Sequence, residues 1–203
     1  MPRLLVGLVL GGVGIACMVR ADLGLPPWSV LDHGINKHTG IPIGTVSILV
    51  GAVVLATWIA LRERPGIGTV CNIVVIGATI DVVLALVPEI TNPVGRVALM
   101  LVGVFIWGPG SGLYIGAGLG PGPRDGLMTG LAARGVGSVR LVRTALELTA
   151  LALGWLLGGR VGIGTLAFAL TIGPNVQFFL QRLTYQVPQP TPIPPPTPAT
   201  IAA

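Results

Sequence analysis

Apolar residues dominate this chain in long uninterrupted runs, and polar residues gather in the short stretches between them. A membrane-spanning helix needs about 20 mostly apolar residues, because a helix rises only about 1.5 Å per residue. Six runs approach that length and predict membrane spans. The six are residues 4–19, 44–61, 67–87, 94–117, 139–157 and 161–183.

Two shorter stretches, residues 22–40 and 119–136, interrupt this pattern. Proline lacks a backbone donor and pushes the preceding residue out of helical geometry, yet it is well tolerated in a first helical turn. Each stretch therefore predicts a break followed by a half-helix that is too short and polar to cross a membrane. The residues of this broken-helix motif are Gly24, Pro26, Pro27, Gly120, Pro121 and Pro123.

The two halves of the chain match at a constant offset of 96 positions, which relates Pro27 to Pro123. Gly66-Ile67-Gly68-Thr69 recurs intact as Gly162-Ile163-Gly164-Thr165 in the same register. Such a match is hard to obtain by chance even in a chain rich in glycine and leucine, so the chain is a duplication. It divides into a first membrane repeat, a connector, a second membrane repeat and a proline-rich tail predicted to be disordered: 1–88, 89–93, 94–186 and 187–203.

An odd number of spans in each repeat would insert the second copy upside down. With the N-terminus inside, eight arginines fall on the cytoplasmic side or just within it, against four basic residues outside, a bias in the direction of the positive-inside rule. We therefore expect an all-α polytopic membrane protein with about six spans in two inverted three-span repeats. Both termini would be cytoplasmic, and the half-helices would re-enter from opposite faces.

Composition supports membrane insertion. Only 9% of the residues are charged and 52% are hydrophobic, with a mean hydropathy of +0.87, whereas soluble domains carry about 25% charged residues. The net charge of +5 then indicates basic cytoplasmic loops, and no nucleic-acid partner is expected. Cys17 and Cys71 lie inside apolar runs and suggest neither a disulfide nor a metal site.

Broken helices in inverted repeats point to a transport site near the middle of the membrane, because half-helix N-termini present free N–H groups and partial positive charge. Ser29 and Asp125 occupy equivalent places there, although Asp125 could instead cap its own helix. Asp81 is the sharpest candidate, since an ionisable residue inside a span usually faces a cavity or a partner. The alternative is that Asp81 lies nearer the outer interface. The proposed substrate or ion path comprises Ser29, Asp81, Asp125, Asn175 and Gln177.

The segments LGLPPWSVL (23–31), TGIPIG (39–44) and IGT (67–69) resemble the YczE/YyaS/YitT-like bacterial integral membrane proteins, and the resemblance extends over residues 4–183. It implies a protein of the bacterial inner membrane and supplies no catalytic residues. The second repeat has Arg124-Asp125 where the first has Trp28-Ser29, so the two half-sites differ chemically.

Two functions remain open from the sequence. The first is secondary transport or export of a small solute, coupled to protons or cations through Asp81; a homodimer is compatible with so few spans. The second is a non-transporting scaffold or regulatory partner that docks through its arginine-rich segment 124–143. No enzymatic motif, cofactor motif or metal-ligand spacing is present, so an enzyme is not expected.

Overall fold

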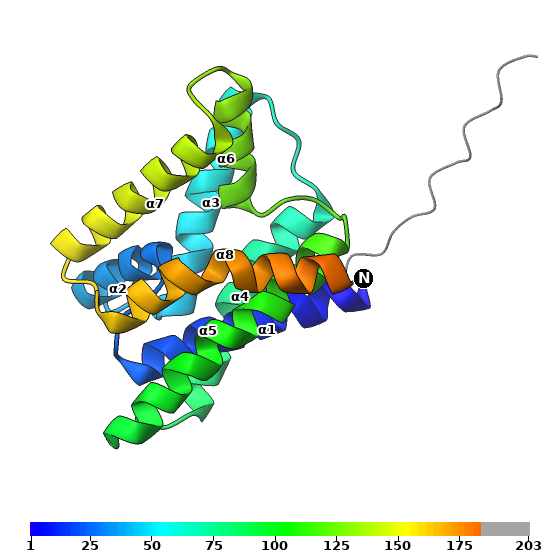
Figure 1. Ribbon diagram of the computed structural model, residues 1–203. Coiled ribbons are helices and arrows are strands. Elements are labelled where there is room, and N and C mark those ends of the chain that lie inside the picture. Colours follow the sequence, from blue (N-terminus) through cyan, green and yellow to red (C-terminus); the bar gives the residue numbers. More distant parts are fainter. Residues whose placement is uncertain (184–203) are drawn as a thin grey trace, which may run out of the picture.

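The computed structural model describes residues 1–183, in which every regular element is an α-helix (Figure 1). The end of the second repeat beyond residue 183 and the whole proline-rich tail lie outside the described residues. The eight helices are α1 (Pro2–Ala21), α2 (Pro27–Thr39), α3 (Ile43–Leu61), α4 (Ile67–Leu86), α5 (Pro93–Gly116), α6 (Pro123–Ala133), α7 (Val139–Leu156) and α8 (Ile163–Leu183).

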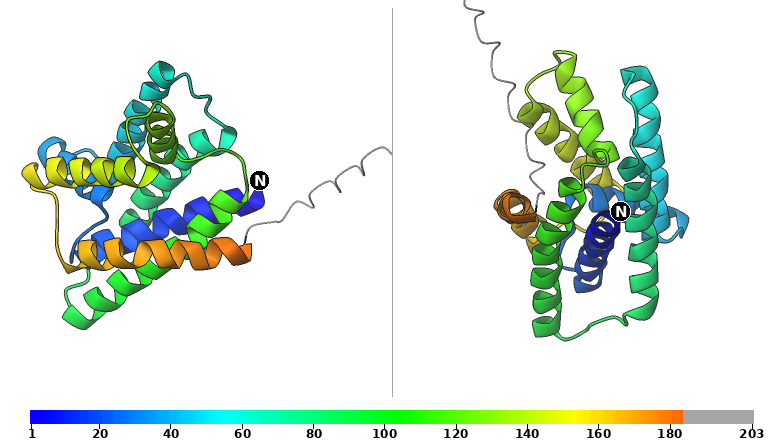
Figure 2. Two further views of the ribbon diagram at one scale, coloured as in Figure 1. Left: turned by 45° about the horizontal axis from the view of Figure 1, so that its top comes forward. Right: turned by 90° about the vertical axis from the view of Figure 1, so that its right-hand side faces the viewer.

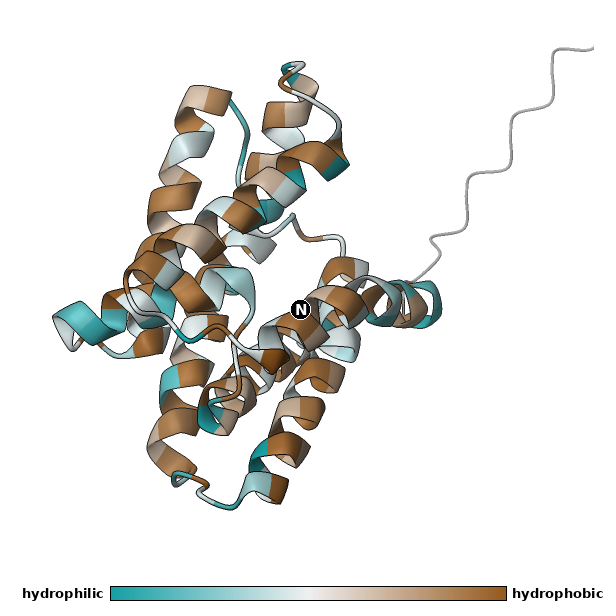
Figure 3. Cartoon of the chain, turned by 60° about the vertical axis from the view of Figure 1, so that its left-hand side comes forward, coloured by the Kyte–Doolittle hydropathy of each residue, from teal (hydrophilic) through white to brown (hydrophobic). Residues whose placement is uncertain are grey.

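Five of these helices, α1, α3, α4, α5 and α8, are long and apolar enough to cross a membrane. The chain is therefore a polytopic helical membrane protein. The expected span at 139–157 forms α7, but Arg140, Arg143 and Glu147 lie within its 18 residues, so it is not among the five. Figure 3 shows apolar residues along the long helices and hydrophilic residues gathered at helix ends and loops.

The helix starts repeat with the sequence. α2 begins at Pro27 and α6 at Pro123, α3 at Ile43 and α7 at Val139, and α4 at Ile67 and α8 at Ile163, so that each pair is 96 positions apart. Proline occupies the first position of both short helices, where its missing donor costs nothing. The short helices predicted from the proline pattern are thus α2 and α6.

α1 and α5 pack against each other more extensively than any other two helices of the described residues, and they run antiparallel (Figures 1 and 2). Glycines bring the two backbones together, because a Cβ at Gly7 would lie 2.6 Å from the carbonyl oxygen of Gly110. A Cβ at Gly103 would likewise lie 2.6 Å from the carbonyl oxygen of Gly14. The offset of 96 turns the first contact into the second, so the same glycine spacing serves both sides of the crossing.

The remaining packing is largely reciprocal. α1 packs on α4 and α5 on α8, while the short helix of each half packs on the third helix of the other half, α2 on α7 and α6 on α3. One relationship breaks the reciprocity: α3 packs along α4, whereas α7 does not pack along α8 in this way. Figures 1 and 2 show α7 and α8 standing apart beyond the loop that joins them.

The sequence accounts for this difference. Gly44 of α3 meets the backbone of Gly77 and the carboxylate of Asp81 on α4, and Gly51 meets Ile73. The second repeat has Arg140, Glu147 and Gln177 at the positions of Gly44, Gly51 and Asp81. Long polar side chains cannot support the close backbone contact that glycine allows. The second half therefore stays open where the first half is closed.

Candidate solute-binding cavity

Each repeat ends its first long helix in a loop that is held by the other repeat. The carbonyl oxygen of Leu23 accepts a hydrogen bond from the N–H of Gly164 at 2.8 Å, and the carbonyl oxygen of Leu119 accepts one from Gly68 at 2.8 Å. The following glycines adopt φ angles of 120° at Gly24 and 118° at Gly120, which other residues rarely adopt. Each Leu-Gly segment is therefore bound to the Gly-Ile-Gly-Thr segment of the other repeat, and we call this contact the joint.

The threonines of these segments complete the joint. The hydroxyl oxygen of Thr69 accepts from the N–H of Gly66 at 3.2 Å, and that of Thr165 accepts from Gly162 at the same distance, so both threonines cap their helices. The Thr69 hydroxyl also donates to the carbonyl oxygen of Pro121 at 2.7 Å. These contacts set the direction in which α2 and α6 begin.

A cavity of about 390 Å³ lies where the two short helices begin. The first residues of α2, including Trp28 and Ser29, line one side, and Arg124 and Asp125 of α6 line the other. Neither helix has a side chain from its N-cap residue, Pro26 or Gly122, bonded to its free N–H groups. Both helix dipoles therefore direct partial positive charge into the cavity. Trp107 of α5 and Phe168 of α8, whose rings pack edge to face, supply apolar wall.

The two short helices are joined by Asp32 and Arg124, of which Arg124 lines the cavity. A nitrogen of the Arg124 guanidinium lies 3.7 Å from a carboxylate oxygen of Asp32, and the guanidinium stacks on Trp28 at 4.6 Å from the ring centroid. Asp32 is 1% exposed, and its other oxygen, Oδ1, is buried without a hydrogen-bond partner. Burial raises the pKa of Asp32 to about 6, against the opposing effects of Arg124 and of the Ser47 hydroxyl.

Further charged groups lie around the same space. Arg143 and Glu147 of α7 line the cavity and pair at 2.9 Å, one helical turn apart. Burial raises the pKa of Asp125, while Arg143, Arg124 and the Gly122 backbone N–H lower it. The hydroxyl of Tyr114, a residue only 7% exposed, lines the cavity without a hydrogen-bond partner. The cavity thus carries buried polar atoms that a ligand could satisfy.

Three of the five predicted path residues line this cavity: Ser29, Asp125 and Gln177. Asp81 does not. Its carboxylate accepts hydrogen bonds from the N–H groups of Gly44 at 2.6 Å and Thr45 at 2.7 Å, and from the Thr45 hydroxyl at 2.7 Å. Asp81 therefore accepts hydrogen bonds from the free N–H groups at the start of α3 and holds that helix against α4. Asp125, for which capping was the alternative, faces both the cavity and the Gly122 N–H.

Asn175 also lies outside the cavity lining. Its side-chain amide donates to the carbonyl oxygens of Val104 at 3.0 Å and Phe105 at 3.2 Å. Pro109, inside α5, has no N–H to offer Phe105, four residues earlier. The Asn175 amide replaces that missing donor, so Asn175 repairs the proline break in α5.

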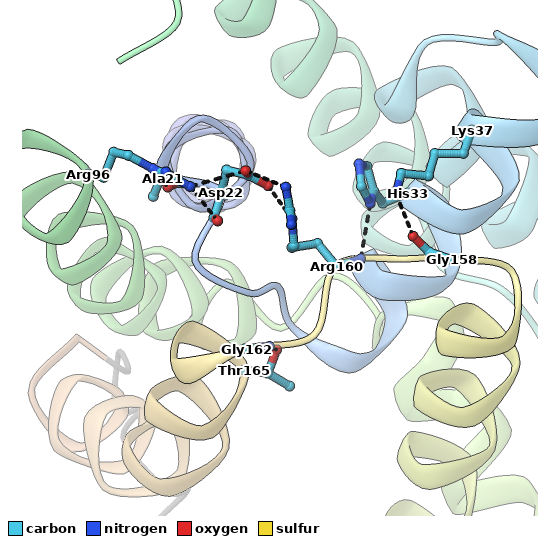
Figure 4. Close-up of polar contacts among 9 residues, drawn as sticks. All are labelled: Ala21, Asp22, His33, Lys37, Arg96, Gly158, Arg160, Gly162 and Thr165. Atoms are coloured by element: carbon cyan, nitrogen blue, oxygen red, sulfur yellow. Dashed lines mark hydrogen bonds and ion pairs between the residues drawn. The ribbon is translucent and has the colours of Figure 1, made fainter. Parts of the chain in front are cut away.

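At the C-terminal end of α1, which we call the closed end, a polar network links the residue after α1 to α2, α5 and the loop before α8 (Figure 4). Asp22 binds Arg160 through two hydrogen bonds of 2.5 Å and contacts Arg96 at 3.1 Å. The N–H of Arg160 donates to Nδ1 of His33, and Lys37 donates to the carbonyl oxygen of Gly158. Gly118 stands at the position equivalent to Asp22, so the second repeat cannot form the same ion pairs.

Sequence reasoning did not single out Asp32, Arg124 or Tyr114 for the site. Both charged residues lack a counterpart, because Met128 is equivalent to Asp32 and Trp28 to Arg124. The sequence signal that could have identified Asp32 and Arg124 is that each is a charged residue with an uncharged counterpart in the other repeat. Among the described residues, no group of three or more His, Cys, Asp or Glu side chains could hold a metal ion.

The family model described as "Family of unknown function (DUF6198)" matches residues 1–181. A protein of Haemophilus influenzae is 41% identical over 177 residues, which cover 87% of this chain and 81% of the relative. The membrane protein YczE of Bacillus subtilis is 34% identical over 187 residues, covering 89% and 87%, and YyaS of the same organism is 23% identical over 179 residues, covering 86% and 89%. No solved structure matches the chain. The chain belongs to the DUF6198 family, and the resemblance to YczE and YyaS is confirmed.

Proposed function

We propose that this protein is a secondary transporter for a small solute, with its binding site in the cavity between the N-termini of α2 and α6. The observation that carries the proposal is the set of buried charged and unpartnered polar atoms around this cavity. Ionisable groups inside a membrane protein are costly and usually serve a ligand or ion path. Here Arg124 and Tyr114 line one cavity together with the free ends of two helices, and the buried Asp32 contacts Arg124 from outside the lining. The proposal assigns no chemical reaction to the chain.

The proposed topology is six spans in two inverted repeats, with α7 as the sixth span. Support comes from the antiparallel crossing of the equivalent helices α1 and α5, which a pair of parallel repeats would not produce. The charges that lower the hydropathy of α7 include Arg143 and Glu147, and these line the cavity. An ion pair facing a polar cavity can be accommodated in a spanning helix. Both termini would then be cytoplasmic, in the inner membrane of a bacterium.

The cavity extends toward the side of the molecule where the chain begins. Its lining includes Gly7 near the start of α1 and Leu180 near the end of α8. Toward the other end of α1, Phe168 of the lining belongs to a buried cluster with Met18 and Val104, and the carbonyl oxygen of Met18 accepts a hydrogen bond from the N–H of Asp22. In the proposed cycle this conformation is open toward the cytoplasm and closed outside, and transport requires the Asp22–Arg160 contact to open.

Ligand binding to the purified full-length protein tests the proposal. A library of metabolites and ions is screened by thermal shift in detergent, and a ligand at about 100 times its Kd adds about 2.7 kcal/mol to folding stability. Ser111→Phe places a large ring in the cavity, whereas Thr171→Phe places one on the exposed face of α8 outside it. The expected result is a hit that Ser111→Phe abolishes and Thr171→Phe retains.

A protein that unfolds cooperatively but responds to nothing in the library would refute the transporter. It would favour the scaffold function suggested by the arginine-rich segment. A hit that both variants retain equally would move the binding site away from this cavity. Uptake of the identified ligand into proteoliposomes, compared with protein-free vesicles, then separates transport from binding.

A further inference from the structure

The guanidinium of Arg124 is held in place by Trp28 and Asp32 but is not saturated by them. Its nitrogen lies 3.7 Å from the Asp32 carboxylate, beyond ordinary hydrogen-bond length, and the ring of Trp28 occupies one face of the group. A guanidinium has five N–H donors. Arg124 lines the cavity, so donors remain for a ligand there.

Other donors converge on the same space. The first turns of α2 and α6, of 13 and 11 residues, present their N–H groups without a cap from Pro26 or Gly122. The Tyr114 hydroxyl is buried, unpartnered and part of the lining, so a ligand acceptor would relieve an unpaired polar group. Helix ends, a guanidinium and a phenol together match an anion.

The acidic residues limit the charge of that anion. Asp125 and Glu147 also line the cavity, and Arg143 is already paired with Glu147 at 2.9 Å. Of the charged lining residues that the structure describes, Arg124 is then the cation left to balance the ligand, and the Asp125 carboxylate would oppose the second charge of a group such as phosphate. Trp107 and Phe168 provide a wall for an apolar body. The lining thus favours one carboxylate attached to an apolar group.

We propose that the cavity binds a small monoanionic carboxylate with an apolar body, and that Arg124 passes from Asp32 to this carboxylate while Asp32 takes up a proton. The inference rests on the proposed function and names its substrate class and coupling ion. The charges balance, because one anion and one proton from solution enter together and the proton adds to the Asp32 carboxylate. This proposal assigns the coupling of transport to protons to Asp32, whereas the sequence had suggested Asp81.

The surroundings of Asp32 support this exchange. Arg124 from α6 is the cation that faces it, and Ser47 from α3 contributes a hydroxyl. On its own helix, His33 and Lys37 are directed to Arg160 and Gly158 at the closed end. Asp125, Arg143 and Glu147 complete the charged groups around the cavity. When Arg124 turns to a ligand, no other cation among the described residues pairs with Asp32, and a buried carboxylate without a partner favours its protonated form.

Benzoate is the probe for this proposal. Benzamide is its neutral counterpart, benzylamine its cationic counterpart, and inorganic phosphate tests the charge limit. Binding is measured by thermal shift and titration calorimetry on the detergent-purified protein. Benzoate is expected to bind and the other three to bind at least about tenfold more weakly, a difference of about 1.4 kcal/mol. Arg124→Gln should abolish benzoate binding and Arg124→Lys should weaken it, while the exposed Arg140→Gln is a matched control that should not change it.

Proton uptake separates the exchange from simple anion binding. In lightly buffered solution at pH 7 with an indicator dye, the wild type should take up about one proton for each benzoate bound. Asp32→Asn should bind benzoate with almost no proton uptake. Benzoate binding without uptake by the wild type, or equal uptake by Asp32→Asn, would overturn the coupling.

The failure of this inference is distinguishable from the failure of the proposed function. Tighter binding of benzylamine, benzamide or phosphate than of benzoate, sensitive to Ser111→Phe, would overturn the carboxylate and leave a solute-binding cavity. No response to these probes or to the wider library would refute both the carboxylate proposal and the proposed transporter. Benzoate binding that survives Arg124→Gln but not Ser111→Phe would retain the cavity and overturn the role of Arg124.

Discussion

The carbonyl oxygen of Leu23 and the N–H of Gly164 are joined by a hydrogen bond of 2.8 Å, and the equivalent pair, Leu119 and Gly68, is joined over the same distance. Each contact ties the loop before a short helix to the first turn of the last long helix in the other half. The two halves therefore cannot be positioned independently. The start of each short helix, and with it one side of the cavity, depends on both repeats.

Gly164→Ala should destabilise this joint. A Cβ there would lie 2.5 Å from the carbonyl oxygen of Gly24, and backbone cannot move aside as easily as a flexible side chain. We expect a loss of about 1–3 kcal/mol in the free energy of unfolding, measured by SDS titration in mixed micelles. Gly68→Ala, where the Cβ would lie 2.8 Å from the Leu119 oxygen, should behave alike. Gly173→Ala is the control: nothing lies within 4 Å, so it should be neutral or slightly stabilising.

Asp81→Asn should reduce stability by about 1–3 kcal/mol, because an amide can accept fewer of the three hydrogen bonds from Gly44 and Thr45 and carries no charge at the start of α3. Binding of any cavity ligand should change less than about twofold once the variant is folded, which calorimetry can measure. Thr45→Val, which removes one of the donors, should give a smaller loss. A folded Asp81→Asn protein of normal stability that no longer binds the ligand would return Asp81 to the transport path.

Asn175 and Pro109 should be coupled energetically. Asn175→Ala removes the donor to Phe105 and should cost about 1–2 kcal/mol in unfolding free energy. In a Pro109→Ala background the restored N–H can bond to Phe105 directly, so the same change should cost less. A double-mutant cycle measured by SDS titration gives the interaction energy. Full additivity of the two changes would contradict the repair role of Asn175.

Stability should depend on pH through Asp32. The pKa of this carboxyl rises from 3.8 to about 6 on folding, so the folded state binds a proton more tightly than the unfolded state. Its contribution is therefore complete below pH 4 and is lost as the pH rises through 6, a change of about 2–3 kcal/mol. Thermal unfolding of the wild type, relative to Asp32→Asn, should show this decline between pH 4 and 7. A constant difference over that range would contradict it.

Asp22→Asn should loosen the closed end. The pair with Arg160 is partly exposed, so the loss of stability should be small, about 1 kcal/mol or less. The larger effect is expected on access. In a background with Cys17→Ala and Cys71→Ala, the engineered Ser29→Cys should react faster with a membrane-impermeant thiol reagent from the outer side when Asp22→Asn is present. Glu63→Gln, outside this network, is the control. Unchanged reactivity in the Asp22→Asn variant would show that the Asp22–Arg160 contact does not control access from the outer side.

Several features of this protein follow from the sequence alone. Hydropathy and length determine that the chain is a helical membrane protein, because a run of about 20 apolar residues can satisfy its backbone in lipid only as a helix. Proline and glycine determine where α2 and α6 begin, since these residues act on their own backbone. The constant offset of 96 positions identified the duplication. Three pairs of helices begin at positions separated by the same offset.

Only the tertiary structure decided which polar residues meet. Asp81 and Asp32 are both carboxylates in a largely apolar chain, and nothing local distinguishes them. Asp81 meets the first N–H groups of α3, 36 and 37 residues earlier in the chain, whereas Asp32 meets Arg124 from the other repeat. A buried charge takes its role from the donors that packing brings within about 3–4 Å. Those partners come from distant helices, so the cavity and its charge pair became visible only when the two halves were assembled.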